Sequence, residues 1–121
     1  MGQLEVEEVD DVVVVGLQGE HDLSTAPSLS GRLRGFANDG YGVVVDVGEA
    51  EFVDLAVVRA LFEADEALRS QGRRLALLFG TACPVKRLLQ LTGTQTMFAC
   101  AEDRAEAIAL AGNANSPRST V

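Results

Sequence analysis

The chain has 121 residues, enough for one domain with a single buried core and too few for two ordinary domains. Its 18 acidic and 10 basic residues give a formal net charge of -8, and this balance disfavours binding to the phosphate backbone of a nucleic acid. Hydrophobic residues make up 47% of the chain and aromatic ones 5%, with no Trp, so a core of Val, Leu and Ala is expected.

The sequence contains no apolar run of the roughly 20 residues that a membrane span needs. The N-terminal "MGQLEVEE" also lacks the basic and apolar stretches of a signal peptide. We therefore expect a cytoplasmic protein with no membrane insertion. Cys83 and Cys100 have no CxxC or Cys/His spacing, so they are expected to be reduced and to pack as small apolar residues. His21 is the only histidine and no acids have metal-ligand spacing, so neither a metal nor another cofactor is expected.

The first elements along the chain are predicted to be two strands and a helix. Residues 4–9 alternate between apolar and polar, and "VVVVGLQG" at 12–19 is typical of a strand buried on both faces, so the two should form a hairpin. Helical spacing of apolar residues then predicts a helix over 26–37, with Pro27 in its first turn and Ser24 and Thr25 as its caps. This helix should end near Gly40.

A second strand and a second helix follow. "YGVVVDV" at 41–47 predicts a buried strand, and "GEAEF" at 48–52 is interpreted as a loop. Asp54 fits the N-cap of the next helix, because a carboxylate there accepts hydrogen bonds from unpaired backbone N–H groups. The apolar face of this helix is expected to include Leu55, Val58 and Leu61, and Gly72 should end it.

The last third of the chain continues the alternation of strands and helices. We predict a buried strand in "RRLALLFG" at 73–80, a short helix from Pro84, a short strand "MFAC" at 97–100 and a helix over about 102–111. This order favours one α/β domain over residues 1–111. The polar segment 112–121 is expected to be a disordered tail.

The residues offer little support for catalysis. Glu20, His21 and Asp22 are close together in "GEHDLS", but paired carboxylates need environments that separate their pKa values, and no nucleophile motif accompanies the histidine. No glycine-rich phosphate motif is present. The "GTACPVKR" turn at 80–87 could hold an anion, although a strand-to-helix turn with solvated bases explains it as well. We therefore predict that the protein is not an enzyme.

Three segments together resemble the STAS domain of bacterial anti-sigma-factor antagonists. "GEHDLSTAPSL" resembles that family's Gly-Glu-Leu-Asp turn and the helix after it, and "VVVDVGEAEFVD" resembles its strand and Asp-containing loop. "CPVKRLLQLTG" resembles its Pro-Ala-Val-Arg-Arg-like helix, and the match spans about residues 4–111. The resemblance implies an α/β, STAS-like fold with a mixed sheet of four to five strands and about four helices mainly on one side.

The resemblance also implies a non-catalytic regulator of sigma-factor-dependent transcription. Its partner would be an anti-sigma factor with a histidine-kinase-like ATPase fold. In the family this kinase phosphorylates a Ser that directly follows the Asp corresponding to Asp54, and the phosphate breaks the complex. Here Leu55 stands at that Ser, Ala56 at the second hydroxyl residue and Val57 at the Gly of the pattern. Leu55 has no hydroxyl group, so this position cannot be phosphorylated.

We expect the partner to bind at the start of the second helix and at the loop before the first. The expected contact residues are Glu20, Asp22, Ser24, Thr25, Asp54, Leu55, Ala56, Val57 and Val58. Leu55 could contact the partner or pack into the domain's own core, and the sequence does not decide between the two. A surrogate phosphosite at Ser24, Thr25 or Ser70 is disfavoured, because these residues are explained by capping and by a helix end.

Two other functions stay open at this point. STAS-like domains also serve membrane transporters, so the chain could be an accessory subunit of a lipid or solute transport complex. It could also sense a small molecule or nucleotide at the 80–87 turn. The sequence further leaves open whether an exposed edge strand pairs two copies into a homodimer.

Overall fold

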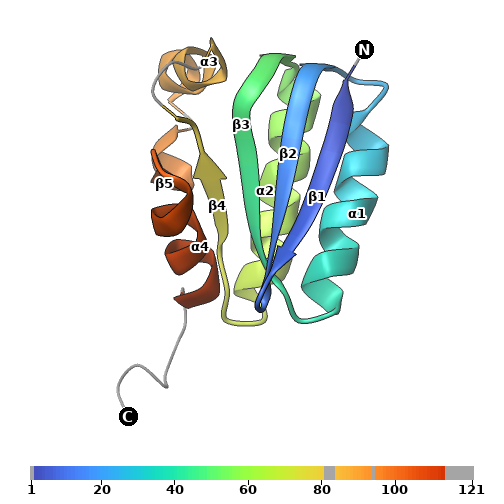
Figure 1. Cartoon of the computed structure of the whole chain (residues 1–121). Helices are drawn as coiled ribbons and strands as arrows, with labels where there is room; N and C mark the ends of the chain where they lie inside the picture. Colours follow the sequence, from blue (N-terminus) through green and yellow to red (C-terminus); the bar gives the residue numbers. More distant parts are fainter. Residues whose placement is uncertain (1, 81–83, 94, 114–121) are drawn as a thin grey trace.

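The computed structural model describes residues 2–80, 84–93 and 95–113, which form one sheet with helices on both faces (Figure 1). The strands are β1 Gln3–Val9, β2 Val12–His21, β3 Gly42–Val53, β4 Leu75–Leu78 and β5 Ala99–Ala101. The α-helices are α1 Ala26–Asn38, α2 Leu55–Arg69, α3 Pro84–Thr92 and α4 Arg104–Asn113, and a short 3-10 helix, η1, spans Gln95–Met97.

The five strands lie in the sheet in chain order, from β1 to β5. β1 and β2 form the predicted antiparallel hairpin, whose turn has Asp10 at a φ of 55°, a region that Asp tolerates better than most residues. The remaining neighbours pair in parallel, so the sheet is mixed, as expected. Parallel strands point their carboxyl ends at the same edge of the sheet.

Helices α1, α2 and α3 contribute to the main core on one face, and α4 covers part of the other face (Figure 1). The valine run of β2 explains this arrangement, since Val13 and Val15 face the main core while Val12 and Val14 face α4. All four are buried, which confirms the predicted strand with two covered faces. The prediction of about four helices, mainly on one side, is also confirmed.

β3 is longer than predicted, and this difference shapes the candidate site. The segment 48–52 is not a loop, because β3 continues to Val53 and pairs with the end of β2. Glu20 accordingly belongs to β2 rather than to a turn. The pairing is interrupted by two register shifts, one between Gly16 and Gln18 and one between Gly19 and Glu20. This stretch contains Gly and Glu and does not alternate regularly between apolar and polar residues. Because of this and of the register shifts, the end of the strand cannot be recognised from hydrophobic periodicity.

Smaller differences concern the C-terminal third of the chain. β5 begins at Ala99, two residues after the predicted start, because η1 occupies the segment before it. α4 continues to Asn113, beyond the expected end at 111. Cys83, the rest of the 81–83 turn and the tail from residue 114 lie outside the described residues, so the predictions for them stay predictions.

Cys100 lies in β5 and is half-buried, with its Sγ donating to the carbonyl oxygen of Phe98 at 3.6 Å. Burial raises the pKa of this thiol, and the nearby Lys86 opposes the rise. A raised thiol pKa disfavours the reactive thiolate at neutral pH. In the ranges that the structure covers, no helix is both long and apolar enough to cross a bilayer.

Candidate partner-binding site

The loop after β2 and the start of α2 lie side by side at the carboxyl edge of the sheet. Glu20 pairs with Phe52 and His21 with Val53, so the two strands end together. The backbone N–H of Asp54 then donates to the carbonyl oxygen of His21 at 2.9 Å. Two segments that are about 30 residues apart in the sequence are thereby brought to one surface, as the resemblance implied.

Asp54 is the N-cap of α2, which confirms the prediction. Its backbone is extended, with φ -78° and ψ 158°, and its Oδ1 accepts a hydrogen bond from the Ala56 N–H at 2.8 Å. Its carbonyl oxygen accepts from the N–H groups of Val57 and Val58 at 2.9 and 3.2 Å. The carboxylate also faces the positive end of the helix dipole. Asp54 therefore fixes where α2 begins and which way Leu55 points.

Leu55 is the first residue of α2, and its side chain is 58% exposed. The alternative that Leu55 packs into the domain's own core is therefore wrong. Val57 and Val58, two of the expected contact residues, are buried in the main core, and Ala56 is half-buried against it. We leave the side chains of Val57 and Val58 out of the proposed contact surface for this reason.

Sequence reasoning missed two exposed apolar residues at the same edge of the sheet, Leu23 and Phe52. Leu23 lies in the loop between β2 and α1, and Phe52 is the penultimate residue of β3. Phe52 precedes the buried Val53, so strand alternation turns it to the opposite face of the sheet. The orientation of Phe52 could be predicted only if residues 48–53 were already known to form a strand.

Asp22 organises the loop before α1. Its Oδ1 accepts hydrogen bonds from the Ser24 N–H at 2.9 Å and from the Ser24 hydroxyl at 2.6 Å. The hydroxyl bond is the main reason that the pKa of Asp22 is lowered. The Thr25 hydroxyl bonds to the backbone N–H and carbonyl of Asp22, at 3.1 and 3.0 Å.

The predicted capping by Ser24 and Thr25 is wrong in its detail. Thr25 occupies the N-cap position of α1, but its side chain makes no capping hydrogen bond to the helix. The hydroxyls of Ser24 and Thr25 instead bond to Asp22. The physical reason is local competition, since the carboxylate of Asp22 binds the Ser24 hydroxyl and the backbone of Asp22 binds the Thr25 hydroxyl.

His21, at the end of β2 beside this surface, contacts β1. Its side chain is buried, and its Nε2 lies 3.2 Å from the carbonyl oxygen of Gln3 in β1. A carbonyl only accepts, so Nε2 is the donor in this contact. Nδ1 is buried and has no hydrogen-bond partner among the described residues. The buried ring therefore helps to hold the end of β2 against β1.

The described residues contain no group of three or more His, Cys, Asp or Glu side chains that could hold a metal ion. The surface therefore consists of exposed apolar side chains, one helix cap and an ordered acidic loop, which are the elements of a protein contact.

A family model for the STAS domain matches residues 3–107. The chain belongs to the STAS domain family. This match confirms the resemblance, and the five-stranded mixed sheet agrees with the fold that the resemblance implied. A search of curated protein sequences found no match to the chain.

Solved structures with the same fold include several anti-sigma factor antagonists. One from Mycobacterium paratuberculosis has a TM-score of 0.78 and 24% identity, over 93% of this STAS chain and 95% of that one. A candidate antagonist from Thermotoga maritima has a TM-score of 0.76 and 22% identity, over 86% and 90% of the two chains. SpoIIAA of Bacillus in its phosphorylated form has a TM-score of 0.65 and 22% identity, over 89% and 96%. At these identities the similarity establishes the fold.

Proposed function

We propose that this STAS domain is a non-catalytic binding protein that acts as an anti-sigma-factor antagonist without the usual phosphorylation switch. Its partner would be a cytoplasmic anti-sigma factor with a histidine-kinase-like ATPase fold. Support comes from the antagonists that share the fold, among them SpoIIAA in a phosphorylated form. The observation that carries the proposal is the exposed Leu55 directly after the Asp54 cap.

Leu55 is suited to a constitutive contact. It is held by the first turn of α2 and points its apolar side chain to solvent. Covering the exposed part of a leucine contributes about 1 to 2 kcal/mol to binding. A rigid helix start loses little conformational entropy when the partner docks. Leu23 and Phe52 add exposed apolar area at the same edge of the sheet.

The same residue accounts for the absence of a switch. A phosphoserine beside Asp54 would place about two further negative charges against the partner and would weaken the complex by repulsion and desolvation. Leucine cannot accept a phosphate. Regulation in this proposal depends on the amounts of the two proteins, or on another site, and not on phosphorylation at Leu55.

An affinity capture from the source cell tests the proposal. The tagged protein is compared with Leu55→Glu, which places a charge at the contact, and with Leu91→Glu, which alters a 74% exposed leucine on α3. An ATPase-fold anti-sigma factor should be captured by the native protein and by Leu91→Glu, and lost with Leu55→Glu.

Either of two results would contradict the proposal. Capture of membrane transport subunits in place of an anti-sigma factor would favour the transport-subunit alternative. Equal capture of the anti-sigma factor by the native protein and by Leu55→Glu would show that the interface does not include the start of α2. Circular dichroism of each variant shows whether it is folded, so a loss of capture is not confused with unfolding.

A further inference from the structure

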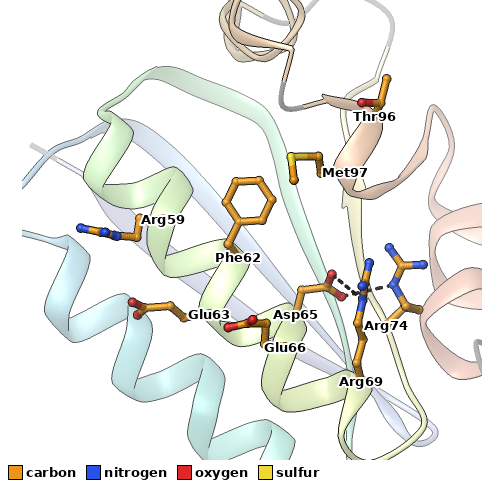
Figure 2. Close-up of a pocket in the computed structure, with 9 residues that line it drawn as sticks. All are labelled: Arg59, Phe62, Glu63, Asp65, Glu66, Arg69, Arg74, Thr96 and Met97. Carbon is orange, nitrogen blue, oxygen red and sulfur yellow. Dashed lines mark hydrogen bonds and ion pairs between the residues drawn. The ribbon is translucent and has the colours of Figure 1, made fainter.

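A groove of about 700 Å³ lies along α2 (Figure 2). Residues of α2, the segment before β4 and η1 line it, among them Arg59, Phe62, Asp65, Arg69, Arg74 and Met97. Its volume lies within the range of small-molecule sites, which is roughly 300 to 1,000 Å³. Only Arg59, one helical turn after Leu55, approaches the proposed protein contact.

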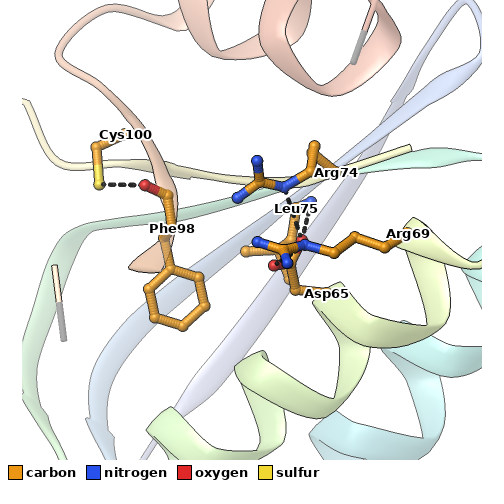
Figure 3. Close-up of polar contacts among 6 residues, drawn as sticks. All are labelled: Asp65, Arg69, Arg74, Leu75, Phe98 and Cys100. Atoms are coloured by element: carbon orange, nitrogen blue, oxygen red, sulfur yellow. Dashed lines mark hydrogen bonds and ion pairs between the residues drawn. The ribbon is translucent and has the colours of Figure 1, made fainter. Parts of the chain in front are cut away.

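One end of the groove is organised by the buried carboxylate of Asp65. Its Oδ1 accepts from the Leu75 N–H at 2.9 Å and from the Arg74 Nε at 3.3 Å, and its Oδ2 lies 3.2 Å from the Arg69 Nε (Figure 3). Both arginines thus use Nε toward Asp65. Their Nη groups make no other hydrogen bond or ion pair within the part of the chain that the structure describes. Two guanidinium groups around one carboxylate leave one net positive charge and several unused donors.

The other wall of the groove is apolar. The ring of Phe62 stacks on Phe98 with centroids 4.5 Å apart and an interplanar angle of 22°. Met97 is 54% exposed, and Figure 2 shows its thioether beside the Phe62 ring. A flexible, polarizable thioether next to an aromatic ring suits a flat apolar ligand. The groove therefore offers an apolar wall near a pair of hydrogen-bonding cations.

The acids at the rim limit the charge of the ligand. Glu63 is 3.4 Å from Arg34 of α1, so its charge is compensated. Glu66 also lines the groove, where it offsets part of the positive charge of Arg59, Arg69 and Arg74 and disfavours each further anionic group on a ligand. A ligand with one anionic group fits this balance, whereas a highly charged one, such as a nucleoside triphosphate, does not.

We propose that the groove binds a small organic molecule with a flat apolar body and one terminal oxyanion group, a phosphate or a carboxylate. The oxyanion accepts hydrogen bonds from the Nη groups of Arg69 and Arg74, which can bind it in a bidentate manner. The apolar body lies against Phe62 and Met97. This site does not depend on the proposed function and would stand if the partner were a different protein.

Titration of the labelled protein by NMR with four probes tests the proposal. Phenyl phosphate and phenylacetate carry both features, inorganic phosphate carries the anion alone, and phenol carries the ring alone. At least one of the first two should give saturable shifts centred on Phe62, Arg69 and Met97. Its affinity should exceed that of phosphate or phenol about tenfold, the effect of one charge-assisted contact.

Matched variants locate the site. Arg69→Gln should weaken the best probe about tenfold, while Arg32→Gln on the exposed side of α1 should leave it unchanged. Met97→Gln is a second test at an exposed side chain, and it keeps the experiment decisive if Arg69→Gln does not fold. The proposal is overturned if neither amphipathic probe saturates, if the shifts spread over the whole surface, or if the groove variants bind as tightly as Arg32→Gln.

Discussion

The N–H of Asp54 donates to the carbonyl oxygen of His21 at 2.9 Å, and this bond extends the pairing of β2 with β3 to the start of α2, so that the two halves of the candidate partner-binding surface are held together. On the side of β2, His21 is anchored to β1 by the contact of its Nε2 with the Gln3 carbonyl. On the side of β3, Asp54 caps α2 through the Ala56 N–H. The position of Leu55 is therefore set by contacts of neighbouring residues that do not involve its own side chain, and replacing Leu55 should not disturb them.

Asp54→Ala should lower the free energy of unfolding by about 1 kcal/mol, because the first turn of α2 loses its side-chain acceptor. Asp54→Ser keeps an acceptor at the same position and should retain most of the stability. Urea denaturation followed by circular dichroism measures both changes. If the two variants were equally destabilised, the capping hydrogen bond would not be the source of the effect.

If the proposed function is right, Leu55→Ser should introduce a phosphorylation switch at the start of α2. The new hydroxyl follows Asp54 at the position that the resemblance assigns to the phosphorylated serine. Because Leu55 is exposed, the exchange should change stability by no more than about 0.5 kcal/mol. With the anti-sigma kinase and ATP, the variant should gain one phosphate and leave the complex. The native protein, with Leu55 at this position, is the control and should gain no phosphate under the same conditions.

Much of the fold could be predicted from the sequence because its signals are local. The valine runs of β2 and β3, Pro27 in the first turn of α1 and the Asp54 cap each follow from neighbouring residues. The end of β3 could not be predicted, since residues 48–53 gain their strand structure from pairing with β2 across two register shifts. Their Gly- and Glu-containing sequence favours a loop when read alone.

The Asp54 cap in the candidate site could be predicted from the sequence, whereas the exposure of the residues around it could not. The sequence pattern is compatible with Leu55 on the apolar face of α2. Only the packing of α2 shows that Leu55 lies outside the core and is exposed. The burial of Asp65 could not be predicted, for the opposite reason. An acid at that position fits a solvated helix face, whereas its burial depends on Arg74, just before β4, and on the N–H of Leu75, the first residue of β4.

Asp65→Ala should lower the free energy of unfolding by about 2 to 3 kcal/mol, because the buried Leu75 N–H loses its acceptor and two ion pairs are broken. Arg69 and Arg74 are partly exposed and can be rehydrated, which keeps the loss below that of a fully buried pair. Asp65→Asn retains an oxygen for Leu75 and should cost about 1 kcal/mol. Equal losses in chemical denaturation would contradict this account.

The loop before α1 should weaken in acid. The pKa of Asp22 is lowered in the folded protein from its ordinary value of 3.8, chiefly by the Ser24 hydroxyl. The stabilisation is therefore present above that value and is lost as the pH falls through the lower, folded-state pKa. Ser24→Ala should raise the pKa of Asp22, as followed by the side-chain NMR signals. An unchanged pKa in this variant would show that the hydroxyl is not the cause.

The most direct test of the central claim mixes the purified native protein with its anti-sigma partner and ATP, and follows the complex by size-exclusion chromatography and intact-mass spectrometry. A switchless antagonist should stay in the complex after ATP is added, with the mass of its chain unchanged. A chain that gains the mass of one phosphate while the complex dissociates would contradict the claim and would place a working switch at another residue.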